Sequence, residues 1–519
     1  MKAKFRTVPG SIVAPKGFLA SGVFCDIKRL GTGKGSAKGR KRDLAFIVSE
    51  VPATVAGMFT TNQVCAAPVK VCLDRVKKGV AQAIVVNSGN ANACTGRHGL
   101  KDAIEMAHLT AEALNRRRVG CPQPTNSRGD TRRYIKTEHV LVGSTGRIGV
   151  TLPMENVKTG ILDAVTRLDN AAECANHALE AIMTSDTLPK QIAVEFRLSG
   201  KTVRLGGICK GAGMIQPGMS GTGVRPPAIP HPAANSARAQ ALHATMLCFI
   251  TTDAAIEATA LQAALHEAVA NSFNRITVDG DMSTNDTVLV LANGLAGNPH
   301  IVAADVRRRT KSTNPSASLR RRLRQLAMFQ SALNHVCLEL AKMIVRDGEG
   351  VSRFVTVRVH GARNFAEADA AARSVANSAL VKTSWNGGDP NWGRIIDALG
   401  YSSAKVVEEK VDIGYSAPLG SARRRRASAG GSSAGTSRAD SFNTRAAYAP
   451  HKILWSLKRG QPTKATFKQL CDAVAAKEFD LHINLNLGKA SSVIYAADLT
   501  EAYVEFNKGD VSDPASLGG

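Results

Sequence analysis

The sequence has few aromatic residues, no metal-ligand pattern and no long apolar segment. Aromatic residues make up 5% of the 519 residues, and Phe442 is the one aromatic residue within the basic stretches. Proteins that bind single-stranded nucleic acid stack the bases on several aromatic side chains. No apolar run approaches the roughly 18 residues of a membrane-spanning helix. The ten cysteines are widely spaced and form no CxxC pair or Cys/His cluster. We therefore expect reduced, mostly buried thiols, no metal site and no membrane partner.

Targeting signals are also lacking. The first thirty residues contain neither the apolar core of a signal peptide nor the Arg- and Ser-rich amphipathic pattern of a transit peptide. This absence predicts a cytoplasmic protein.

Positive charge is abundant but confined to four short stretches. The net charge is +25, and residues 28–42, 116–133, 302–325 and 417–447 together carry +24 of it. A basic tract without a recognition module binds nucleic acid only non-specifically. We interpret these stretches and the Pro- and Ala-rich residues 219–241 as low-complexity surface insertions, with 417–447 as a disordered loop. We expect no nucleic-acid partner.

Between the insertions, strand-like and helical patterns are mixed. Strand-like runs occupy residues 44–48, 83–86, 247–250, 287–291, 354–359 and 481–487. Helical periodicity occupies residues 101–115, 171–183, 255–270, 329–345 and 364–380. Residues 192–198 and 201–207 follow each other with only a turn between them, which favours antiparallel pairing. The pattern predicts an α/β fold of layered sheets covered by helices.

Two neighbouring segments carry the most informative motifs. They read KGAGMI at 210–215 and HATMLCFITTDA at 243–254. Taken alone, Thr245 is an ordinary strand residue, since β-branched side chains favour strands. Together, however, the segments resemble the ornithine acetyltransferase (glutamate N-acetyltransferase) family, in which KGAGM is followed by ATML and the chain is cut before the threonine.

The resemblance extends over the chain outside the insertions. Further matching motifs, in order, are APKGF at 14–18, FTTN at 59–62, VNSGNANA at 86–93, GSTG at 143–146, MTSDT at 183–187, DGDMSTNDT at 279–287, DGEG at 347–350, DPNWGR at 389–394 and DLT at 498–500. So many ordered motifs make a chance match implausible. The 210–245 interval is longer than in the family, because 219–241 is inserted upstream of the expected cut.

The resemblance implies a self-processing enzyme with an N-terminal-nucleophile-like fold, that of the ornithine acetyltransferases. Cleavage between Ala244 and Thr245 would give an α chain, 1–244, and a β chain, 245–519, associated as a heterotetramer. Thr245 would be the nucleophile, with Thr145 and Gly146 stabilising the oxyanion. The expected substrate-binding residues are Thr184, Lys210, Thr245, Glu349, Asn507 and Ser512.

The implied reaction moves an acetyl group from N-acetylornithine to glutamate in arginine biosynthesis. It is a ping-pong cycle through acetyl-Thr245 that needs no cofactor or metal. The resemblance leaves acetyl-CoA open as a second acetyl donor. Two alternatives also stay open: a self-processing aminopeptidase or amidase of the same architecture, and a basic nucleic-acid-binding protein on an inactive enzyme frame.

A pair of acidic residues, Asp279 and Asp281, flanks Gly280 and could suggest a metal site. No third ligand of suitable type lies near them in the sequence. We interpret the segment as a tight turn whose carboxylates accept backbone hydrogen bonds.

Overall fold

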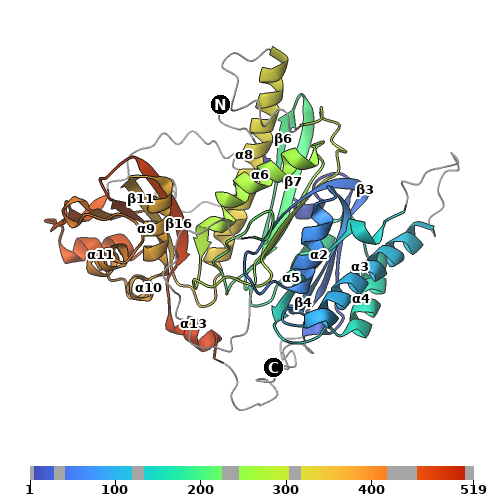
Figure 1. Ribbon diagram of the computed structural model, residues 1–519, viewed down its shortest axis with the longest axis horizontal. Coiled ribbons are helices and arrows are strands. Elements are labelled where there is room, and N and C mark those ends of the chain that lie inside the picture. The colour runs from blue at the N-terminus through green and yellow to red at the C-terminus, as the bar shows by residue number, and fades with distance from the viewer. Residues whose placement is uncertain are drawn as a thin grey trace, which may run out of the picture.

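A computed structural model describes residues 5–28, 41–119, 134–224, 245–302, 317–417 and 453–508. These residues form two β-sheets, each covered by helices (Figure 1). The predicted layered α/β architecture is confirmed. Within the described ranges, no helix is long and apolar enough to cross a membrane.

The larger sheet has nine strands in the order β1-β6-β7-β8-β10-β3-β4-β5, with β2 paired to β3. Its strands are β1 (Arg6–Thr7), β2 (Phe18–Val23), β3 (Leu44–Phe59), β4 (Val80–Asn90), β5 (Val140–Arg147), β6 (Lys190–Leu198), β7 (Lys201–Lys210), β8 (Leu247–Thr252) and β10 (Thr287–Ala292). The predicted antiparallel pair is confirmed as β6 and β7. Strands β8 and β10 are parallel neighbours at the centre.

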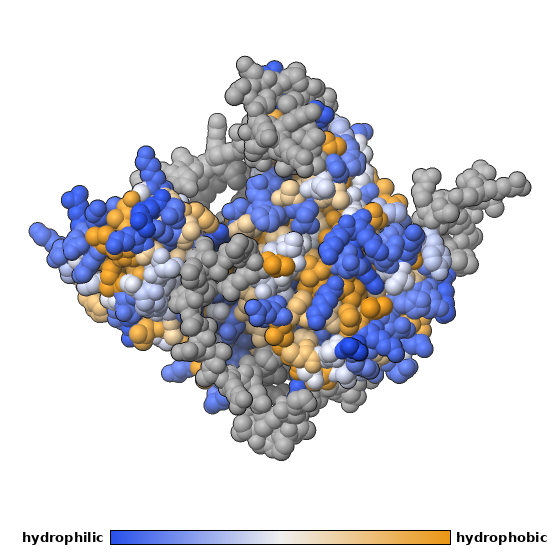
Figure 2. Space-filling model, in the orientation of Figure 1, coloured by the Kyte–Doolittle hydropathy of each residue, from blue (hydrophilic) through white to orange (hydrophobic). Residues whose placement is uncertain are grey.

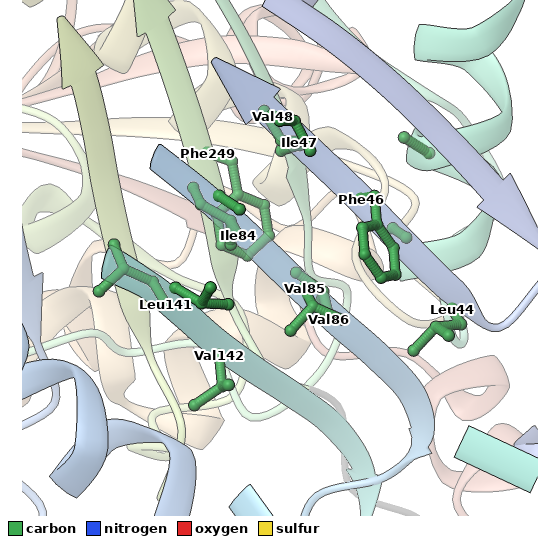
Figure 3. Packing of buried hydrophobic residues seen from close by; sticks show 14 of the residues in the cluster. Leu44, Phe46, Ile47, Val48, Ile84, Val85, Val86, Leu141, Val142 and Phe249 are labelled. Carbon is green, nitrogen blue, oxygen red and sulfur yellow. The ribbon is translucent and has the colours of Figure 1, made fainter. Parts of the chain in front are cut away.

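Helices cover both faces of this sheet. One set is α2 (Ala67–Val76), α3 (Gly96–Val119), α4 (Met154–Thr166) and α5 (Ala172–Ile182), and the other is α6 (Ala258–Ala270) and α8 (Ala317–Arg346). Because side chains alternate along a strand, Phe249 of β8 joins the first core, beside Val86 and Leu141 (Figure 3), whereas Cys248 and Ile250 join the second. Strand β8 is therefore buried on both faces.

The smaller sheet has seven strands in the order β14-β13-β12-β15-β11-β16-β9. They are β9 (Ile276–Thr277), β11 (Phe354–Ala362), β12 (Asp412–Ser416), β13 (Leu454–Lys458), β14 (Gln461–Pro462), β15 (Glu478–Asn484) and β16 (Ala490–Ala497). The remaining helices are α9 (Phe365–Asn377), α10 (Ala379–Asn386), α11 (Trp392–Gly400), α12 (Phe467–Val474) and α13 (Glu501–Phe506). Short 3-10 turns lie at Ser11–Val13, Thr137–His139, Phe273–Arg275 and Glu408–Lys410. On the face shown in Figure 2, hydrophobic and hydrophilic residues are interspersed over the parts of the molecule built on the two sheets.

In two of the predicted insertions, basic residues extend regular helices. Helix α8 begins at Ala317, inside the predicted insertion 302–325, and already buries Gln325. Helix α3 continues through Val119, inside 116–133. Arginine is a good helix former, so a charged stretch can prolong a helix beyond its apolar periodicity.

The other predicted insertions fall mainly outside the description. Within 219–241, Met219 is a buried core residue and Ser220 bridges to Phe59, so this beginning is not an exposed loop. Residues 29–40, 225–241 and 418–447 lie outside the described residues.

Candidate active site

The two informative motifs meet at neighbouring strand ends. Lys210, the last residue of β7, pairs with Leu247, the first residue of β8, and Leu247 also pairs with Thr287 of β10. This register places Thr245 next to the turn that precedes β10. Its side chain is buried, and its hydroxyl shares a hydrogen bond of 2.8 Å with the hydroxyl of Ser283.

Lys210 is a fully buried cation that links β7 to the end of β5. Its Nζ donates a hydrogen bond of 3.2 Å to Thr145 Oγ1 and lies 3.9 Å from an Asp186 carboxylate oxygen. Burial lowers the pKa of Lys210, although Asp186 acts in the opposite direction. The structure thus brings together two of the residues that the sequence predicted, Thr145 and Lys210.

Gly146 follows Thr145 where the backbone of β5 passes very close to β4. Its φ is +132°, and a Cβ there would lie 2.2 Å from the carbonyl carbon of Gly89. No side chain fits that space, and this backbone conformation favours glycine. The close approach fixes the position of the Thr145-Gly146 peptide.

Glu349 and Asn507 form a second polar pair. The amide Nδ2 of Asn507 donates to Glu349 Oε2 at 3.1 Å, and Glu349 is buried. Burial raises the pKa of Glu349, and its charge interacts with that of Lys210. Among the described residues, Glu349 Oε1 and Thr184 Oγ1 are buried without a well-formed hydrogen bond, although the Ser185 side chain interacts with the Glu349 carboxylate. Ala244 and Ser512, which were also predicted for this site, lie outside the described residues.

A buried charge network supports Lys210, and no role for it was predicted. Asp186 accepts hydrogen bonds from Lys190 Nζ at 2.6 Å and from the Gly211 amide at 2.7 Å. Burial opposes its ionisation, but Lys210 and Lys190 outweigh burial and lower the pKa of Asp186 to about 2. Lys190 also donates to Asp347. Asp186 and Asp347 lie in the motifs 183–187 and 347–350, and this membership was the sequence feature that could have pointed to a role for them.

Asp286 is a further residue whose role the sequence did not reveal. Its carboxylate accepts a hydrogen bond of 3.1 Å from the Met246 amide, immediately after Thr245. Burial raises the pKa of Asp286 to about 8. Both Asp286 and Ser283 belong to the motif 279–287, but their types alone gave no reason to assign them roles.

The acidic pair around Gly280 forms the expected turn. Gly280 has a φ of +85°, and the Asp279 carboxylate accepts hydrogen bonds from the Met214, Ile215 and Asp281 amides. Burial raises the pKa of Asp279 to about 6. Within the described residues, no group of three or more His, Cys, Asp or Glu side chains could hold a metal ion.

The described cysteines are free thiols, and most are wholly or partly buried. Five of them are buried: Cys25, Cys72, Cys209, Cys248 and Cys337. Cys94 is exposed, contrary to the general expectation. It lines a surface pocket of about 440 Å³ with Lys70 and Arg97. None of the predicted catalytic or substrate-binding residues lines that pocket.

Comparison with known proteins decides the family. The sequence matches the ArgJ family over residues 29–509. The chain belongs to the ArgJ family. The predicted family is thereby confirmed, and with it the enzyme class, an acyltransferase.

Several ArgJ relatives are similar over most of their length. The arginine biosynthesis bifunctional protein ArgJ of Symbiobacterium thermophilum is 45% identical over 78% of this chain and 83% of its own. The glutamate N-acetyltransferase of Methanocaldococcus jannaschii is 42% identical over 79% and 82%. The bifunctional ArgJ protein of Geobacter sulfurreducens is 38% identical over 95% and 98%.

Two solved structures are similar in sequence to part of the chain. A chain of the Bacillus halodurans bifunctional ArgJ protein is 37% identical and covers 42% of this chain and 100% of its own, with a TM-score of 0.36. A chain of the Mycobacterium tuberculosis ornithine acetyltransferase complexed with ornithine is 35% identical, with the same coverage and a TM-score of 0.35.

Proposed function

We propose that this ArgJ-family chain transfers an acetyl group from N-acetylornithine to glutamate in arginine biosynthesis, through an acetyl-Thr245 intermediate. The products are ornithine and N-acetylglutamate. The observation that carries the proposal is the buried Thr245 hydroxyl beside the strand end that holds Lys210, whose ammonium contacts Thr145. This arrangement supplies a nucleophile and an electropositive centre at one position.

Self-cleavage between Ala244 and Thr245 prepares the nucleophile. An internal threonine hydroxyl is a weak nucleophile, but a freed α-amino group, which titrates near about 7.7–8, can accept its proton. Cleavage therefore places a base on the nucleophilic residue itself. The products are the α chain, 1–244, and the β chain, 245–519, which we propose remain associated and pair into a heterotetramer in the cytoplasm.

The oxyanion of the tetrahedral intermediate is stabilised by Thr145 and Gly146. The Thr145 hydroxyl and the Gly146 amide are candidate donors, and the tight β4–β5 contact holds them in place. Preorganised donors in a site shielded from water contribute much of the rate acceleration in acyl transfer. The Lys210 ammonium next to Thr145 adds positive potential where negative charge develops.

The substrates are amino acids with charged ends, and the site offers matching groups. We propose that Lys210 attracts a substrate carboxylate, and that Glu349 and Asn507 bind an ammonium group. Glu349 Oε1 and Thr184 Oγ1, which make no well-formed hydrogen bond among the described residues, support this assignment, because buried polar atoms are normally paired. Ser512 would complete the pocket.

A transfer assay tests the function directly. Purified protein given N-acetylornithine and glutamate should form N-acetylglutamate and ornithine in equal amounts, with parallel double-reciprocal plots. A parallel assay with acetyl-CoA determines whether it is a second acetyl donor. Release of acetate at the same rate with and without glutamate would contradict the proposal and favour an amidase.

A further inference from the structure

Asp286 is placed to interact with an α-amino group that exists only after cleavage. Its Oδ1 accepts the Met246 amide at 3.1 Å, while the Met246 carbonyl accepts the Thr287 amide at 3.1 Å. Adjacent backbone nitrogens are separated by at most about 3.7 Å, given standard bond lengths. The nitrogen of Thr245 therefore lies at most about 7 Å from Asp286 Oδ1.

The second carboxylate oxygen of Asp286 lacks a well-formed hydrogen bond in the uncut chain. Asp286 is fully buried, and its Oδ2 makes no well-formed hydrogen bond among the described residues, although the Ser283 backbone also interacts with the carboxylate. Buried carboxylate oxygens without a donor are costly, so native proteins rarely retain them without a reason. A new donor beside Thr245 would remove this cost.

We propose that Asp286 is the positioning residue and counter-ion of the Thr245 α-amino group in the cleaved enzyme. This inference rests on the proposed function, since it requires cleavage before Thr245. As the bond from Thr245 Oγ1 to the acetyl carbon forms, the hydroxyl proton passes to the α-nitrogen. The resulting ammonium donates to Asp286 Oδ2. The proton then moves to the ornithine nitrogen as the acetyl C–N bond breaks.

The charged surroundings of Asp286 support a counter-ion role. Lys210 and Asp279 are the charged groups that influence it, and they act in opposite directions. In the uncut chain, burial raises the pKa of its carboxyl to about 8. An ammonium within hydrogen-bond distance would favour the ionised carboxylate, and the carboxylate would in turn raise the pKa of the amine.

Titration of the Thr245 amine in cleaved protein tests the inference. Reductive methylation with formaldehyde and cyanoborohydride modifies neutral amines, and mass spectrometry quantifies the peptide that begins at Thr245. With Asp286→Asn, the pH of half-maximal labelling should fall by about one unit or more, because the carboxylate no longer stabilises the ammonium. Asp102→Asn, at a buried carboxylate of α3 whose charged neighbours are His98 and Lys101, should leave this midpoint unchanged.

The outcomes separate the inference from the proposed function. An unchanged midpoint in Asp286→Asn, or an equal shift in Asp102→Asn, would overturn the counter-ion role. Absence of a Thr245 N-terminus in unsubstituted protein would contradict the proposed function itself. If Asp286→Asn blocks cleavage, the two chains can be co-expressed separately as residues 1–244 and as residues 245–519 preceded by an initiator methionine. Removal of that methionine in the cell gives the same Thr245 N-terminus for titration.

Discussion

The Lys210 ammonium is buried among partners that account for its charge. Asp186 lies 3.9 Å away and is itself bound to Lys190, so Asp186 keeps a cation if Lys210 is lost. In contrast, no other cation among the described residues contacts the Thr145 hydroxyl, to which Lys210 donates its hydrogen bond. Lys210 should therefore matter more for activity than for folding.

Lys210→Met should fold but lower kcat/KM for N-acetylornithine by about 100-fold, comparable to the loss of one oxyanion donor. Steady-state assays and circular dichroism measure the two effects. Lys78→Met is the matched control, because Lys78 pairs with Glu138 at the surface, and it should leave kcat/KM unchanged. Equal activity in Lys210→Met and the parent would remove Lys210 from the site.

The backbone at Gly146 allows an equally specific prediction. Gly146→Ala should lower transfer by about 100-fold or more, because the new methyl group collides with the Gly89 backbone and displaces Thr145. Gly149→Ala is the control: it also has a positive φ, +84°, but nothing lies within 4 Å of its Cβ. Gly149→Ala should cost only backbone strain, about 1–2 kcal/mol of stability, with activity retained. Full activity in Gly146→Ala would refute the assigned role.

Sequence motifs predicted which residues would gather but not what holds them. Lys210 and Thr145 were expected in one site, and they are in contact. The supporting residues Asp186, Ser283 and Asp286 belonged to recognised motifs, but their roles depend on strand register. A sequence cannot show that Met246 and Asp286 become neighbours, since 40 positions separate them and the link is one hydrogen bond.

Among the elements, strands were predicted more reliably than helix ends. Alternating burial fixes β8, because its side chains from Leu247 to Ile250 enter the two cores in turn. The start of α8 at Ala317 was missed because its first turns are rich in arginine rather than apolar residues. Arginine favours a helix in these first turns, although the periodic apolar residues begin only further along α8.

The smaller sheet contains a histidine that should make stability depend on pH. His482 of β15 is buried and shares a hydrogen bond of 2.9 Å with Ser416 of β12. Burial lowers its pKa from 6.5 to about 4. The unfolded chain binds the proton more readily, so this stabilisation is complete above pH 6.5 and is lost as pH falls toward 4.

His482→Gln should therefore flatten the decrease in stability between pH 7 and pH 4.5 by at most about 3 kcal/mol. Thermal unfolding at the two pH values measures the difference. The exposed His108 of α3 provides the control, and His108→Gln should follow the parent. An undiminished loss of stability in His482→Gln would show that this side chain does not titrate as described.

At the scale of the whole molecule, the proposed cut does not divide the fold into separate bodies. Strand β7 belongs to 1–244 and β8 to 245–519, yet they pair from Leu205↔Thr252 to Lys210↔Leu247. Lys190 and Asp347, one from each side of the cut, also form a buried ion pair. The proposed cleavage would therefore leave the central sheet continuous.

The two product chains should stay together until the sheet unfolds. Size-exclusion chromatography of cleaved protein in 1 M salt should give one peak containing both chains, because buried pairs are screened much less than exposed ones. Separation of the chains under these native conditions would contradict the described strand pairing.

We propose that Thr245 is both the residue at the cut and the nucleophile. Intact mass and N-terminal sequencing of purified protein, read beside the transfer assay, test it most directly. The parent should give chains of 244 and 275 residues, the second beginning at Thr245. Thr245→Ala should remain one inactive chain of 519 residues, whereas Thr245→Ser, which retains the hydroxyl, should cleave and keep partial turnover. An active, uncut parent, or normal acetyl transfer by Thr245→Ala, would contradict it.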